Sequence, residues 1–400
     1  MLRTRRSRTL ATATAVLLSL AAAGCSKSAG GSDASSSAGT KAAAPVALAG
    51  SVTYNQTNLA KLDAALKSAL AGKDLSKVDI AMVVNVAADY WKAGQVGFLK
   101  GCSDLGIAKS KCTYFAPPGG KLTEQNSELE TLRSQGVTGY SISAIDPTSA
   151  AGTIHTDVQK GIGVLAIDSP LPGTDAASLY LGTPNQTAGF QAGTAMKQVL
   201  GGKGKVAILV GSLTASNATQ RIAGFEAAFK GTKITVAQKV NDNLQAGTAT
   251  SDAETILANN PDVNGLYGAH SYDGPALAQA VTSAGKTSSV HIVSDDSDAQ
   301  TLKFIKSGVI SGTVVQMPYQ QGYTGAYILA AEKVLGKDKT MALGPTHHEG
   351  LGGRRDTAPP PPTPAPASAS TPTPSNARPA PTGSGSSRDG GPSSAASAGS

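Results

Sequence analysis

Short runs of β-branched and aliphatic residues alternate with longer helical stretches between residues 76 and 340. The run Val-Ala-Ile-Leu-Val at 206–210 has no polar residue at alternate positions, which is typical of a strand covered on both faces. Strands that are separated by single helices pair in parallel through right-handed crossovers. The alternation therefore predicts an α/β fold with parallel sheets.

Ten segments in this region have strand character. The predicted strands are 78–86, 113–115, 139–143, 163–167, 179–182, 205–210, 234–239, 265–268, 290–293 and 312–316, and the helices include 220–230, 246–259, 275–284 and 320–335. Ten strands are many for one open sheet in a chain of this size, so we expect two lobes.

Polar or aromatic residues follow most of the predicted strands. In parallel α/β sheets, ligands bind where the carboxyl ends of strands meet the N-termini of helices. The strand-end residues are Asn85, Asp89, Tyr90, Trp91, Ser143, Asp146, Asp168, Ser169, Asn217, Arg221, Tyr272, Asp273, Asp295, Asp296 and Gln316. Each alone is more often a helix cap or a turn residue, but so many together favour a binding site.

Six segments, taken in order, resemble the type-1 periplasmic sugar-binding proteins of ABC importers, the ribose- and galactose-binding group. They are GIGVLAIDSP at 161–170, YLGTPN at 180–185, NATQRIAGF at 217–225, PDVNGL at 261–266, IVSDD at 292–296 and GTVVQMP at 312–318. The resemblance runs from about Asp79 to Leu335. It implies two Rossmann-like lobes with parallel sheets, joined by a multi-strand hinge, in a binding protein that is not an enzyme and needs no cofactor.

The resemblance and the composition together divide the chain into six parts. We expect a signal peptide at 1–24, a Ser/Gly/Ala-rich tether with a short helix at 25–75, an N-terminal lobe at 76–182, a C-terminal lobe at 183–316, a return to the N-terminal lobe at 317–344, and a Pro/Ser/Gly-rich disordered tail at 345–400. The last strand that the family would place after Met341 is not recognisable. The tail is an authentic extension or the product of a changed reading frame.

Nine residues form the predicted ligand site. They are Tyr90, Trp91, Ser143, Asp168, Asn217, Arg221, Asp273, Asp296 and Gln316. By resemblance, the two aromatic rings stack on a sugar, while the carboxylates and the guanidinium form charge-assisted hydrogen bonds with its hydroxyls. Ser169 stands where ribose-type proteins have arginine, and Asp273 stands where asparagine is usual. These departures argue against ribose itself, so we expect a monosaccharide or cyclitol.

The N-terminus is typical of an exported chain. A basic stretch is followed by an apolar run at 10–23 and by small residues before Cys25. This run is too short for a membrane-spanning helix. The segment LAAAGC at 20–25 resembles the lipobox of bacterial lipoproteins, so we expect Cys25 to carry a lipid anchor on the outer face of the bacterial cell membrane. The alternative is an ordinary cleaved signal that leaves a free cysteine.

Cys102 and Cys112 are ten residues apart, one near the end of a predicted helix and one at a predicted strand. In an exported protein such a pair favours a disulfide that joins the helix to the strand. We expect no metal site, because the cluster at 347–349 (His-His-Glu) lacks further ligands at a fixed spacing.

The formal charge of +7 first suggests a nucleic-acid partner. Four of the 34 basic residues, however, lie in the first 24 residues, where there is no Asp or Glu, and aromatic residues are only 4% of the chain. The remaining excess is small, and a surface for stacking nucleobases needs repeated aromatic residues. We therefore expect no nucleic-acid partner.

The sequence also bears on three other functions. An enzyme finds no support, because no G-x-S-x-G, H-E-x-x-H or complete P-loop motif is present. A sugar-responsive transcription regulator would carry a helix-turn-helix where the signal peptide lies. A receptor that binds a sugar or an autoinducer and reports its occupancy to a membrane sensor cannot be separated from an importer component by sequence. The preferred hypothesis is a monomer that delivers its ligand to ABC permease and ATPase subunits.

Overall fold

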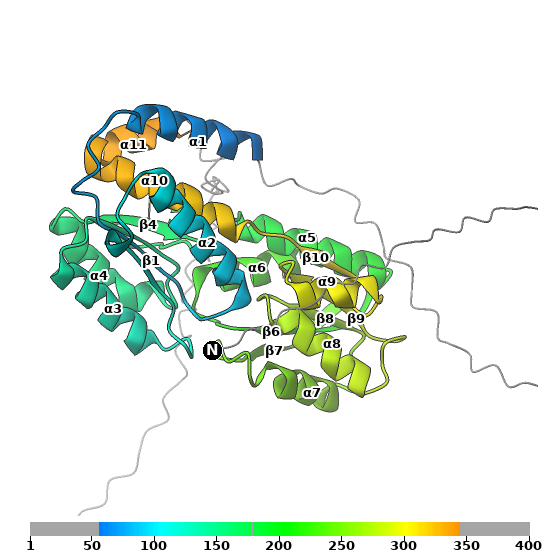
Figure 1. Ribbon diagram of the computed structural model, residues 1–400. Helices are drawn as coiled ribbons and strands as arrows, with labels where there is room; N and C mark the ends of the chain where they lie inside the picture. The colour runs from blue at the N-terminus through cyan, green and yellow to red at the C-terminus, as the bar shows by residue number, and fades with distance from the viewer. Residues whose placement is uncertain (1–55, 178, 345–400) are drawn as a thin grey trace, which may run out of the picture.

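Ten parallel strands form two separate five-stranded sheets in the computed structural model, which describes residues 56–177 and 179–344 (Figure 1). The predicted signal peptide, lipidation site at Cys25 and C-terminal tail lie outside the described residues. Each predicted strand overlaps an observed one. The α/β class with two parallel sheets is thereby confirmed.

The first sheet has the order β2-β1-β3-β4-β5. Its strands are β1 (Ile80–Val83), β2 (Cys112–Phe115), β3 (Gly139–Ile142), β4 (Gly163–Ile167) and β5 (Tyr180–Leu181). The register pairs Ile80 with both Cys112 and Gly139. All four residues of β1 are buried, as expected for a central strand covered on both faces.

The second sheet has the order β10-β9-β8-β6-β7. Its strands are β6 (Lys203–Val210), β7 (Lys233–Asn241), β8 (Gly265–Gly268), β9 (His291–Asp295) and β10 (Gly312–Val314). Read from its other edge, this order repeats that of the first sheet, with β6 in the place of β1 and β9 in the place of β4. The two lobes therefore share one doubly wound topology.

Helices cover both faces of each sheet (Figure 1). In the first lobe they are α2 (Asp89–Asp104), α3 (Leu122–Gln135) and α4 (Pro147–Gln159), and a 3₁₀ turn at Lys109–Lys111 precedes β2. In the second they are α5 (Asn185–Val199), α6 (Ser216–Ala227), α7 (Ala249–Asn259), α8 (Asp273–Ser283) and α9 (Ala299–Lys306). Several helices and strands differ from the predicted bounds by a few residues at their ends, where hydrophobic periodicity carries little information.

Helix α10 (Pro318–Leu335) returns the chain to the first lobe and packs against α2 (Figure 1). The two helices approach closely because α2 carries glycine at the contact. A Cβ atom added to Gly101 would lie 2.8 Å from the carbonyl oxygen of Tyr323. Helix α1 (Gln56–Leu70) and α11 (Lys337–Leu343) lie against α10. After a break at Gly336, the chain is therefore helical again from Lys337 to Leu343.

Candidate functional site

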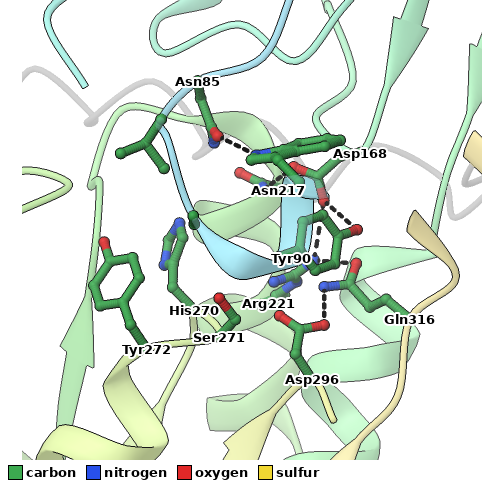
Figure 2. Close-up of a pocket in the computed structure, with 13 residues that line it drawn as sticks. Asn85, Tyr90, Asp168, Asn217, Arg221, His270, Ser271, Tyr272, Asp296 and Gln316 are labelled. Carbon is green, nitrogen blue, oxygen red and sulfur yellow. Dashed lines mark hydrogen bonds and ion pairs between the residues drawn. The ribbon is translucent and has the colours of Figure 1, made fainter. Parts of the chain in front are cut away.

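The carboxyl ends of the strands of both sheets border a cavity between the lobes (Figure 2). Seven of the nine predicted ligand residues line it: Tyr90, Trp91, Asp168, Asn217, Arg221, Asp296 and Gln316. Asn85, Val86, Ala88, His270, Ser271 and Tyr272 complete the lining. The structure therefore brings together side chains that lie as many as 231 residues apart along the chain.

The other two predicted residues lie behind the cavity wall. The Ser143 hydroxyl donates to Oδ2 of Asp168 over 3.0 Å, so it orients a lining carboxylate. Asp273, in the first turn of α8, accepts a hydrogen bond from the backbone N–H of His270 over 2.9 Å. Burial, and then the neighbouring Asp242, hold the pKa of Asp273 well above its ordinary value.

The Asp168 side chain, from the first lobe, contacts residues of the second lobe. Its carboxylate accepts from the side-chain amide of Asn217 over 2.8 Å and from the Tyr90 hydroxyl over 3.4 Å. It also lies 3.5 Å from the Arg221 guanidinium. Asp168 has a φ of 57°, which non-glycine residues adopt rarely, although aspartate tolerates it better than most.

Asp296 occupies the corresponding position in the second lobe. Asp168 directly follows β4 and Asp296 directly follows β9, and Asp296 also has a positive φ, of 72°. The backbone N–H groups of the two residues form equivalent hydrogen bonds: that of Asp168 donates to the Leu181 carbonyl, and that of Asp296 donates to the Val314 carbonyl. The repeated topology thus places one carboxylate on each side of the cavity in the same backbone conformation.

Arg221, on α6, is the cation at the centre of the site, and its side chain is 2% exposed. Its Nε donates to Asn185 and its Nη1 to the Ala269 carbonyl, each over 2.9 Å. Its Nη2 donates to the Gln316 side chain over 2.5 Å, and Asp295 lies 3.2 Å from Nη1. A guanidinium with so many fixed partners is held in one orientation.

The carboxylates of the site outnumber its cation. Burial raises the pKa of Asp168, Asp295 and Asp296, and Arg221 opposes the rise. For Asp295 the result is a pKa of about 6. Burial lowers the pKa of Arg221, but Asp295 and the other carboxylates outweigh burial, so the guanidinium stays charged. Such a site disfavours an anionic ligand and suits a neutral polyol, whose hydroxyls both donate and accept.

An aromatic wall closes one side of the cavity. Tyr90 and Trp91, in the first turn of α2, have ring centroids 4.8 Å apart at an interplanar angle of 85°. The Trp91 indole donates to Asn85 over 2.7 Å, and the Gln321 amide donates to the Tyr90 hydroxyl over 3.1 Å. These hydrogen bonds fix both rings, which offer an apolar surface for the C–H face of a sugar.

His270 lines the cavity but was not among the nine predicted residues. Its Nδ1 accepts from the backbone N–H of Gly211 over 3.0 Å, which places the proton of the neutral ring on Nε2. Burial, with Arg221, lowers the pKa of His270 to about 3, so the ring is neutral and makes no ion pair with Asp273. Its Nε2 has no hydrogen-bond partner among residues 56–177 and 179–344, so the ring of this cavity-lining residue keeps one unpaired N–H donor.

Sequence reasoning missed other contributors to the site as well. Asn185 and Gln321 hold Arg221 and Tyr90 in place, but each lies in the first turn of a helix, where polar residues are common. Asp295 was noted only as a strand-end residue. Its Oδ2 accepts from the buried Tyr267 hydroxyl over 3.1 Å. The useful signal for His270 was its position just after β8.

The cavity has a volume of about 20 Å³, room for about one water molecule. The polar side chains from the two lobes pair with each other across it. A ligand of the size of a sugar ring could therefore enter only if the lobes separated. Within the described part of the chain, no group of three or more His, Cys, Asp or Glu side chains is arranged to hold a metal ion.

Comparison with known proteins gives consistent results. A family model described as periplasmic binding protein domain matches residues 80–338. The D-allose-binding periplasmic protein of Escherichia coli is 23% identical over 67% of this chain and 88% of its own length.

Two solved structures have a similar fold. One is an ABC transporter solute-binding protein from Burkholderia graminis in complex with D-arabinose, with 27% identity, a TM-score of 0.61, and coverage of 66% of this chain and 92% of its own. The other is a XylFII-LytSN complex, with 25% identity, a TM-score of 0.62, and coverage of 65% and 94%.

Proposed function

We propose, from the premise that this chain belongs to the periplasmic binding protein domain family, that it captures a neutral monosaccharide or related polyol and delivers it to an ABC importer. Proteins of this family are extracytoplasmic binding components rather than enzymes. The similar proteins bind D-allose and D-arabinose. The proposal applies their ligand class to the cavity between the two lobes.

The observation that carries the proposal is the interlobe network around Arg221. Asp168 of the first lobe and Asn217 and Arg221 of the second already contact one another. Each is buried and each can bond a hydroxyl. A polyol that inserts between them replaces protein–protein hydrogen bonds with protein–ligand ones, so the buried groups stay paired.

Capture requires that the ligand favour the closed arrangement of the lobes. The ligand first meets the aromatic wall of Tyr90 and Trp91 and the Asp168 carboxylate in the first lobe. Closure then adds Asn217, Arg221 and Gln316. Because these contacts form only when the lobes meet, ligand binding shifts the population toward the closed state.

The chain's attachment and partners belong to the same proposal. Cys25 is lipidated and holds the protein at the outer face of the membrane, with the Ser/Gly/Ala-rich residues 26–50 as tether. No helix within the described ranges is long and apolar enough to cross a membrane. The partners are a permease and its ATPase subunits, and the protein acts as a monomer.

A second candidate function is a ligand-sensing receptor. Its support is the structural similarity to the XylFII-LytSN complex, in which a neighbour is bound to another protein. The sugar site is the same in both functions. Uptake of a radiolabelled ligand by cells that lack this gene separates them: an importer component is required for uptake, while a sensor component is not.

The ligand class is tested by a thermal-shift screen of pentoses, hexoses and inositols on the full chain. We expect at least one neutral sugar or cyclitol to raise the melting temperature, because binding to the native state stabilises it by mass action. The Asp168→Ala variant should lose this rise. If no compound stabilises the wild-type chain, the proposed sugar-binding function is wrong.

A further inference from the structure

A second, larger cavity opens between the lobes beside the ligand site. It is lined in the first lobe by Asp89, Gln95 and Tyr114, among others, and in the second by Tyr272, Ala299 and Gln300, among others. We call it the outer groove. Its volume is about 500 Å³, which lies within the range of small-molecule sites, whereas the inner cavity has only about 20 Å³.

The outer groove is continuous with the ligand site. Four residues line both: Val86 and Ala88 from the first lobe, and Ser271 and Tyr272 from the second. In Figure 2, His270 lies between Tyr272 and the network around Arg221. A ligand held by Asp168 and Arg221 therefore has open space on its Tyr272 side.

We propose that the site also takes ligands longer than one monosaccharide: a neutral glycoside or disaccharide whose first ring is held in the inner site and whose second ring lies in the outer groove. This inference rests on the proposed sugar-binding function. It adds a subsite and a ligand size to it.

The lining of the groove suits a second ring. Tyr114 and Tyr272 supply aromatic side chains, and the Tyr272 hydroxyl is held by Asp242 over 3.0 Å. Ala88 and Ala299 are small and leave space, while Gln95 and Gln300 supply amides for hydroxyls. Aromatic side chains can stack on a sugar or aryl ring, and amide side chains can form hydrogen bonds with its hydroxyls.

The charge around the groove excludes sugar phosphates. Asp89 pairs with Lys92 over 2.6 Å, and Asp298 faces them from the second lobe. Burial, and then Asp89, raise the pKa of Asp298. With two carboxylates and one ammonium in the groove, and carboxylates in excess in the inner site, the lining repels anionic substituents and does not repel neutral ones.

The test compares matched ligands on the full chain by isothermal titration calorimetry. The probes are D-glucose, D-galactose, D-xylose, D-arabinose and D-ribose, each with its phenyl glycosides in both anomeric forms, together with cellobiose, maltose, lactose and melibiose. We expect at least one glycoside or disaccharide to bind about tenfold or more tightly than its parent sugar, which corresponds to burial of a second ring.

Two variants fill the groove. Ala299 and Ala246 both line it and both are exposed, so Ala299→Trp and Ala246→Trp add bulk to the groove without disturbing the core. Each should abolish the advantage of the longer ligand over its parent. Ala227→Trp is the matched control, because Ala227 is an exposed alanine of the same lobe that does not line the groove.

The outcomes separate this inference from the proposed function. If parent sugars bind, but no longer ligand binds better or the tryptophan variants leave the advantage intact, the outer subsite is wrong and the sugar site stands. If no probe binds at all, the outer subsite is wrong, and the thermal-shift screen with inositols decides whether the proposed function is wrong as well. A preference for phenyl glycosides over disaccharides identifies an aryl aglycone as the second ring, and the reverse identifies a second sugar.

Discussion

The side-chain amide of Asn217 in the second lobe donates to Oδ2 of Asp168 in the first lobe over 2.8 Å. This bond crosses the cleft at the place where a ligand hydroxyl is expected. The two lobes thus hold each other through the groups that are proposed to hold the ligand. The affinity for a sugar is then the difference between two sets of hydrogen bonds, and contacts outside the cleft also decide how easily the lobes open.

One such contact lies beyond the cavity lining. Gln245 of the second lobe donates to the Gly119 carbonyl of the first over 2.5 Å, and the buried Leu244 packs against Gly120. The double variant Leu244→Ala/Gln245→Ala removes contacts that join the two lobes in this arrangement. We expect a larger radius of gyration without ligand by small-angle X-ray scattering, and sugar affinity lowered several-fold.

The control for this variant is Gln198→Ala, which removes an exposed glutamine from α5 of the same lobe. It should leave both the radius of gyration and the affinity unchanged. If the double variant behaves like this control, the contact at Gly119 and Gly120 does not influence closure.

The fold was largely predictable from the sequence, because buried parallel strands leave unbroken apolar runs such as 206–210. Site residues that directly follow a strand or begin a helix, such as Asp168 and Tyr90, were predictable for the same reason. Gln321 and Asn185 were not, since their roles depend on how α10 and α5 pack. The outer groove was also beyond prediction, because it depends on the spacing of two lobes that local patterns do not encode.

The only tryptophan in the sequence provides a direct signal of binding. Trp91 lines the inner cavity, and its indole nitrogen bonds to Asn85. A sugar that stacks on this wall changes the environment of the indole. We expect titration with the bound sugar to shift or quench the tryptophan emission in a saturable manner. The Asn85→Ala variant should alter the ligand-free spectrum, and an emission unaffected by a bound sugar would contradict the stacking position.

Cys102 and Cys112 lie on α2 and β2 with Cα atoms 6.6 Å apart, within the range that a disulfide spans. The predicted bridge closes a short loop, so the Cys102→Ala/Cys112→Ala variant should lose about 2–3 kcal/mol of unfolding free energy. Chemical denaturation with and without a reducing agent measures this. Mass spectrometry after alkylation without a reducing agent should find Cys102 and Cys112 unmodified, because the disulfide protects them. Alkylation of both residues would refute the bridge.

Glu332 on α10 makes stability depend on pH. Burial raises its pKa to about 7, with Lys337 opposing the rise. Because the folded state binds this proton more tightly than the unfolded state, stability falls as pH rises from about 4.5 to about 7. Glu332→Gln removes the loss, so it should stabilise the protein by on the order of 2 kcal/mol above pH 7 and by little near pH 4.5.

Thermal denaturation of the wild type and of Glu332→Gln across this pH range measures the difference. Glu254→Gln, at an exposed position of α7, is the control and should show no comparable change with pH. A Glu332→Gln effect that is the same at pH 4.5 and pH 8 would mean that packing rather than ionisation is responsible.

The central claim is that buried polar groups from both lobes bind a neutral sugar, and calorimetric titration of site variants tests it most directly. The probe is the sugar that gives the largest thermal shift. Asp168→Ala and Arg221→Ala should each weaken its binding at least about tenfold, because each leaves a buried ligand hydroxyl unpaired. Asp262→Ala, which removes an exposed carboxylate from the second lobe, should not. Affinities in both site variants equal to that of the wild type would contradict the assigned site.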